Sequence, residues 1–282
     1  MIENALLGIQ KLVVEVVTSN LFETSLIAGA TAALGAYFGA RGAQKFAERS
    51  RKRNEIEKEI RATNKAISLA YASFNTHFGL KCEIFANIKK SFDEETKRFF
   101  DFEHRRAAGD PTAKSFNALI ELKTVDPFPN PNEQLRDVVF DQLSVVGRPI
   151  NLVATLSQAT HSLNQTLVNR REFIRAFKAA KFDDHRKKTL IYLGLLNEDG
   201  SGDETHRNLV DSMCMQNDSC IMFSKMLVDD LKKHGEVLQH HFVSEFGEPA
   251  PSISTIDLST VKHPEMMPDP NDFKDWENSF TG

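Results

Sequence analysis

One polar loop of this sequence carries side-chain oxygens at a spacing that suits calcium. Asn197, Asp199 and Ser201 occupy every second position, and Gly202 follows them, as in the loop of a helix-loop-helix calcium site. The last position of such a loop holds a bidentate Glu, whereas this chain has Asn208. Because that ligand is missing, we interpret the loop as a solvated turn and expect no metal.

His206, Cys214 and Cys220 are close enough in sequence to be considered as zinc ligands. The two cysteines are separated by five residues, and no second ligand pair accompanies them, whereas tetrahedral zinc sites usually have closer spacing. We therefore interpret these cysteines as small buried thiols on a Met-rich helix.

A carboxylate next to an imidazole can orient it for proton transfer, and Asp183, Asp184 and His185 have that order. No Ser or Cys nucleophile motif accompanies them, and acidic residues are common caps at a helix start. No Gly-rich phosphate loop is present either. The sequence predicts a protein without catalytic residues or cofactor, and a cryptic enzyme is only the third hypothesis.

Composition limits the classes of partner. The chain has 282 residues, of which 41% are hydrophobic and 26% charged, and its net charge of -4 argues against binding nucleic acid through general basicity. Three cysteines spread over the chain do not form a secreted disulfide framework and favour a reducing compartment.

Residues 21–40 form the most informative segment, because no charge occurs between Glu23 and Arg41. A membrane-spanning helix needs about 20 residues. The Lys and Arg excess after the segment predicts a single-pass inner-membrane protein with its N-terminus outside and its C-terminal domain cytoplasmic. The alternative is a buried Ala/Gly-rich helix of a soluble protein, because few side chains of the segment are large.

Two sets of residues in and after this segment predict contacts. The small residues recur at four-residue spacing and predict a face for homo-oligomerisation; they are Gly29, Ala33, Gly35, Ala36, Gly39 and Ala40. The basic residues predict contact with anionic headgroups of membrane lipid; they are Arg41, Lys45, Arg49, Arg51, Lys52 and Arg53.

Helical periodicity extends on both sides of the predicted span. Residues 1–20 read as an amphipathic helix with an acidic bias. After the span, apolar residues continue at three- and four-residue steps through Phe78 with no proline before Pro111, which predicts a long helical stalk. A dense set of phenylalanines then requires a covering partner surface.

Residues 41–247 are therefore predicted to form a cytoplasmic stalk and an irregular all-α bundle. Residues 126–132 predict an extended connection, and Pro149 predicts a kink or a new helix start.

Residues 248–282 change character. Five prolines, and seven acidic residues against two lysines, give this tail a charge of about -5 and predict that it lies outside the bundle core. Phe273 and Trp276 are spaced to form one face of a short turn, which would dock on a protein partner or back on the bundle. A disordered solvating tail is the alternative.

Two functional hypotheses follow. The first is a membrane-anchored helical scaffold or sensor that acts through protein-protein interaction. The second is an oligomeric membrane effector or channel subunit gated by its cytoplasmic bundle; it ranks lower because the segment has few polar residues to line a pore.

Overall fold

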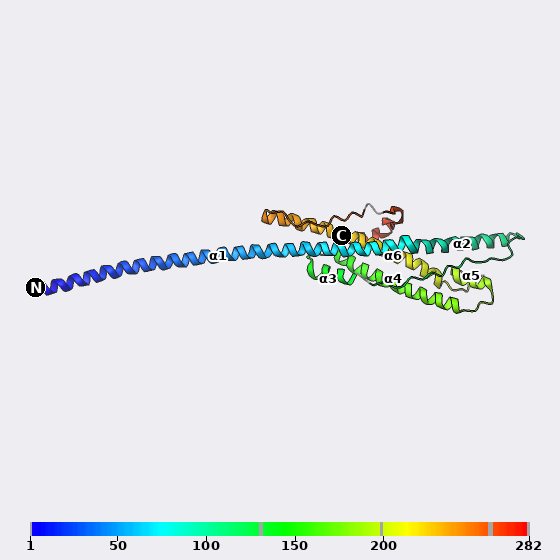
Figure 1. Cartoon of the computed structure of the whole chain (residues 1–282), viewed down its shortest axis with the longest axis horizontal. Helices are drawn as coiled ribbons and strands as arrows, with labels where there is room; N and C mark the ends of the chain where they lie inside the picture. Colours follow the sequence, from blue (N-terminus) through cyan, green and yellow to red (C-terminus); the bar gives the residue numbers. More distant parts are fainter. Residues whose placement is uncertain (1, 130–131, 198–199, 259–261, 281–282) are drawn as a thin grey trace. The chain divides into compact units, whose positions relative to one another are not determined.

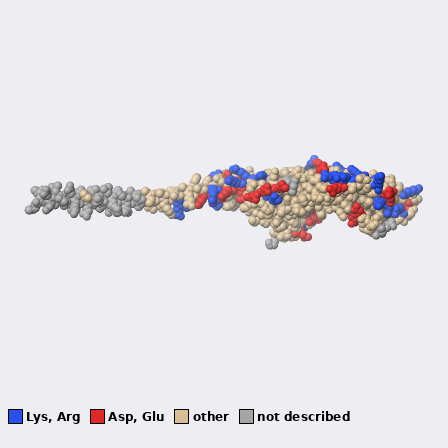
Figure 2. Space-filling view, turned by 90° about the horizontal axis from the view of Figure 1, so that it is seen from below, with Lys and Arg blue, Asp and Glu red and all other residues tan. Residues whose placement is uncertain are grey.

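The computed structural model describes the backbone of residues 2–129, 132–197, 200–258 and 262–280, and their side chains except those of 2–13 and 15–31. The chain divides into two compact units, Met1–Ile56 and Glu57–Gly282. Figure 1 labels the longer helices and colours them in sequence order, and Figure 2 shows Lys and Arg interspersed with Asp and Glu over the face that it draws.

The chain begins with one long helix, α1 (Ile2–Leu80), which passes through the π-helix η1 (Lys81–Phe85) into α2 (Ala86–Ala107). The predicted long helix is confirmed, because helix continues beyond Phe78 and ends before Pro111; its role as a cytoplasmic stalk remains a prediction. The π-helix was not predicted. A π-turn adds one residue to the helix, and such bulges are frequent at functional sites.

An extended connection follows α2 and leads to α3 (Asn132–Gln142) and α4 (Arg148–Ala179). The predicted helix start is confirmed: Pro149 lies in the first turn of α4, where its missing N–H costs nothing. Gly147 precedes α4 at a φ of 71°, a backbone conformation that favours glycine.

The remaining helices are α5 (His185–Leu193) and the long α6 (Thr205–Phe246), followed by the short turns η2 (Pro264–Met266), η3 (Pro270–Phe273) and α7 (Lys274–Asn278). The all-α prediction is confirmed. Within the described part of the chain there is no β-strand, only one isolated bridge between Leu196 and Gly202.

Two apolar clusters hold the second unit together. One joins the last turns of α1 to α3, α4 and the middle of α6, and includes the buried side chains of Phe74, Leu152 and Leu227. The other joins η1 and α2 to α4, α5 and the N-terminal half of α6. The phenylalanines that required a partner surface, such as Phe85 and Phe92, are buried in the second cluster.

The membrane span remains a prediction. Among the described residues, no helix combines the length and hydropathy that crossing a membrane requires. Of the predicted span, residues 21–31 lie outside the described side chains, and residues 32–40 are exposed.

The prediction that the tail lies outside the bundle core was wrong. Leu258 and Phe273 are 6% and 9% exposed and belong to the first apolar cluster, and Ile253, Ile256 and Trp276 pack against it. Average composition hid these side chains, because the prolines and carboxylates around them dominate the mean while a few anchors suffice to dock an extended segment.

Candidate functional site

Large apolar side chains are exposed along the described part of the first unit. Leu34, Tyr37 and Phe38 are 57%, 58% and 64% exposed, and Phe46 is 78% exposed. The predicted oligomer face Ala33, Gly35, Ala36, Gly39 and Ala40 is exposed as well, whereas the Gly29 side-chain position lies outside the described residues. This segment therefore presents both bulky and small apolar groups at its surface.

The predicted headgroup residues follow on the same helix. Arg41, Lys45, Arg49, Arg51 and Arg53 are exposed, and Lys52 is half-buried. Arg41 donates to the Tyr37 hydroxyl at 3.5 Å, and Arg51 pairs with Glu55 at 3.5 Å. Exposed pairs of this kind contribute little to stability, so they do not prevent the cations from contacting a second surface.

The tail is held on the bundle first by contacts to its main chain. The Asn64 side chain donates to the Ser252 carbonyl and accepts from the Ser254 N–H, both at 2.8 Å. Gln239 donates to the Pro251 carbonyl and Lys232 to the Ile256 carbonyl, both at 2.7 Å. We call residues 251–258 the strap. Side chains from α1 and α6 thus fix the strap as an extended segment.

A glycine on α6 makes room for the strap. A Cβ atom built on Gly235 would lie 2.6 Å from Cδ1 of Ile253, far inside van der Waals contact. Glycine inside a helix costs about 1 kcal/mol relative to alanine, and the fit of Ile253 explains its place here.

The two aromatic residues predicted to dock do so on the bundle. Phe273 meets the Phe223 ring of α6 edge to face, with centroids 5.7 Å apart, and Trp276 lies over the same ring at 5.0 Å. Of the two destinations predicted for this pair, the structure shows the bundle; docking on another protein remains a prediction.

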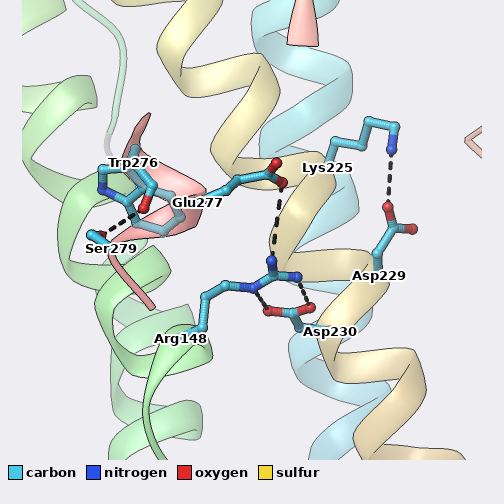
Figure 3. Close-up of polar contacts among 7 residues, drawn as sticks. All are labelled: Arg148, Lys225, Asp229, Asp230, Trp276, Glu277 and Ser279. Atoms are coloured by element: carbon cyan, nitrogen blue, oxygen red, sulfur yellow. Dashed lines mark hydrogen bonds and ion pairs between the residues drawn. The ribbon is translucent and has the colours of Figure 1, made fainter. Parts of the chain in front are cut away.

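An arginine at the start of α4 joins this contact (Figure 3). Arg148 forms a two-pronged hydrogen bond with the Asp230 carboxylate of α6, with its Nε 2.7 Å from Oδ2. Glu277 of α7 lies 4.0 Å from the same guanidinium. Asp230 is almost buried, so the pair orders the surface on which the tail rests.

A cleft of about 560 Å³ opens beside the π-helix, between η1, α2 and α6. Lys81 binds Asp218 at 2.7 Å across it, and Lys89 binds Asp93 and Asp211 at 2.6 and 3.2 Å. Burial raises the pKa of Asp218, although Lys81 opposes that shift. These carboxylates are neutralised by neighbouring lysines, so the cleft presents no net charge that selects a ligand.

The cysteines are poor nucleophiles in their surroundings. Burial raises the pKa of Cys214, which lines the cleft, to about 11, and that of Cys220 to about 12. Because the thiolate is the reactive form, both thiols stay protonated at neutral pH. His206 does not join them as a ligand: its Nδ1 lies 2.6 Å from the Tyr192 carbonyl.

The other predicted polar features are structural where the structure describes them. The Asp184 carboxylate accepts from the Arg186 N–H at 2.8 Å and caps α5, while His185 is exposed. Asn197 and Ser201 hydrogen-bond to each other, and Asp199 lies outside the described residues. No three His, Cys, Asp or Glu side chains of the described segments gather as metal ligands.

Two buried histidines have one unpartnered nitrogen each. His77 contacts Asn217 through Nδ1 at 3.2 Å, and its Nε2 has no hydrogen-bond partner; the same holds for Nε2 of His206. Burial lowers the pKa of both to about 4. Both rings are therefore neutral at physiological pH, and they pack against aromatic rings, His77 against Phe128 and His206 against Phe173.

Comparison with known proteins gave no relative: no family model, curated protein or solved structure matches this chain.

Proposed function

We propose that this protein is a membrane-anchored helical scaffold or sensor that acts through protein-protein interaction. The observation that carries the proposal is the exposure of Leu34, Tyr37, Phe38 and Phe46 on one helix segment. Burying a large apolar side chain contributes about 1.5–3 kcal/mol, so covering this group contributes several times that. A bilayer supplies such a cover for Leu34, Tyr37 and Phe38 within residues 21–40, and Phe46 then lies among the basic residues at the cytoplasmic headgroups.

The proposal includes a homo-oligomer. Gly35 and Gly39 have open space where a Cβ atom would point, so a second helix can approach the backbone closely there. Tyr37, which at 100° per residue lies on the opposite side of the helix from Gly35 and Gly39, offers a control. Gly35→Leu/Gly39→Leu is expected to convert the detergent-extracted protein to a smaller species on sizing, whereas Tyr37→Leu leaves its size unchanged.

Anchoring is tested by fractionating cells that make the full chain. The protein is expected to sediment with membranes, to resist carbonate washing and to require detergent for extraction. Ala32→Arg/Leu34→Arg is expected to move it to the soluble fraction, because both positions lie near the middle of residues 21–40 and an arginine in the bilayer centre costs about 2.5–3.5 kcal/mol.

The matched control is Val146→Arg/Val237→Arg, which adds the same charge at bundle positions that are 81% and 67% exposed. This control is expected to stay in the membrane fraction. A wild-type chain that carbonate washes off the membrane contradicts the anchor, and equal release of both double variants shows that added charge alone causes the effect.

A further inference from the structure

A basic groove lies between the second-unit part of α1 and the end of α3. It has a volume of about 480 Å³ and is lined by Lys58, Arg61, Ala62 and Lys65 of α1 and by Gln142 of α3. The three cations are spaced by three and four residues, so they project from one face of the helix. Ala62, which is 7% exposed, forms a low floor between them.

The α3 side of this groove is held in place by Glu59, a carboxylate on the adjacent face of α1. Glu59 accepts hydrogen bonds from the Ser144 N–H at 2.7 Å and from the Ser144 hydroxyl at 2.5 Å. Nε2 of His234 lies 3.0 Å from the same oxygen. These contacts hold the chain just after Gln142 against α1, so the groove keeps its width without a ligand.

The groove has unbalanced positive charge. Its lining contains three cations and no carboxylate. Arg61 donates to Glu57 at 3.3 Å through one terminal nitrogen, which offsets part of its charge, so Lys58 and Lys65 supply most of the positive charge of the groove. The C-terminus of α3 contributes a partial negative charge of about half a unit, which the charges of Lys58 and Lys65 outweigh.

We propose that this groove binds a soluble phosphorylated small molecule that carries an apolar ring. Like charges at three- and four-residue spacing destabilise a helix by a few tenths of a kcal/mol per pair, and a bound phosphate removes that repulsion. Lysine and arginine are the usual phosphate ligands. The lysine stems and Ala62 supply the apolar surface for a ring, and the volume lies within the usual range of small-molecule sites.

The test uses the full chain in a nonionic detergent and trinitrophenyl-ATP, whose fluorescence rises when its ring enters an apolar site. Saturable binding is expected, with competition by ATP and by pyrophosphate. Lys58→Gln/Lys65→Gln is expected to weaken binding about tenfold. Lys178→Gln/Lys233→Gln removes the same charge from exposed sites elsewhere and is expected to leave the affinity unchanged. Equal unfolding temperatures by circular dichroism show that both variants fold.

Several outcomes overturn the proposal. If the wild type gives no saturable fluorescence increase, the groove does not bind the nucleotide. If both double variants lose affinity equally, the binding reflects a general charge effect. Stronger competition by phosphatidylglycerol vesicles than by ATP at equal phosphate assigns the groove to a membrane surface. Stronger competition by polyglutamate assigns it to an acidic peptide. The membrane-fractionation result does not depend on any of these outcomes, because the variants lie outside residues 21–53.

Discussion

Acidification is expected to destabilise the bundle through His77 and His206. The pKa of each is lowered from 6.5 to about 4, chiefly by burial, so the unfolded chain takes up these protons at a higher pH than the folded chain. Their contribution to stability is therefore complete above pH 6.5 and is lost as the pH falls toward 4.

The magnitude follows from the same pKa values. Between pH 7 and pH 5, each histidine is expected to remove about 2 kcal/mol from the free energy of unfolding, or about 4 kcal/mol together. The neighbours explain the sign: protonation places a second N–H of His77 where no acceptor lies, and it places a charge on His206 near Arg170, which also lowers the pKa of His206. Asp218 acts in the opposite direction, because its pKa is raised.

The assay is urea unfolding of the full chain in mild detergent, followed by circular dichroism at a series of pH values. His77→Gln and His206→Gln are each expected to reduce the slope of unfolding free energy against pH by about half. His240→Gln changes an exposed imidazole and is the matched control, expected to keep the wild-type slope. If both buried variants keep the wild-type slope, the reasoning is refuted, because the contribution of Asp218 is common to all of them.

Further predictions concern the tail and a buried charge. Gly235→Ala is expected to lower the free energy of unfolding by about 1–3 kcal/mol in urea, because the added Cβ would overlap Ile253. Adding Ile253→Ala to this variant should recover part of the lost stability, and no recovery would contradict the contact. Phe223→Ala is expected to increase acrylamide quenching of Trp276, the sole tryptophan; unchanged quenching would show that the ring does not cover it. Arg170→Met is expected to be neutral or stabilising, because Arg170 is 2% exposed and two of its guanidinium nitrogens lack a partner, while the third donates to the Lys123 carbonyl. A loss above about 3 kcal/mol would show that its charge is compensated.

Local patterns in the sequence sufficed for the long helices. The three- and four-residue steps through Phe78 and the absence of proline before Pro111 specify a continuous helix, and Pro149 specifies the start of α4. The π-helix at Lys81 escaped prediction for a physical reason. It adds a single residue, and apolar spacing on its two sides fits a straight helix as well as a bulged one.

The surface of the bundle that binds the tail could not be predicted from the sequence. Asn64, Lys232 and Gln239 read as ordinary polar positions on helix surfaces, and their role appears only when the tail reaches them from distant parts of the chain. One signal was present: Gly235 interrupts an otherwise strong helix, and glycine at such a position often marks a close approach.

The structure changes what a partner must do to bind the tail. Phe273 and Trp276 were predicted to dock on a partner or back on the bundle; both lie on Phe223, and Phe273 is nearly buried. A partner that covers the same rings must first separate them from Phe223, at a cost of about 1.5–3 kcal/mol for each large side chain. The affinity of such a partner is then reduced by the small fraction of chains with a released tail. Docking on the bundle and docking on a partner therefore compete, and whatever weakens the contact of Arg148 with Glu277 shifts the balance toward the partner.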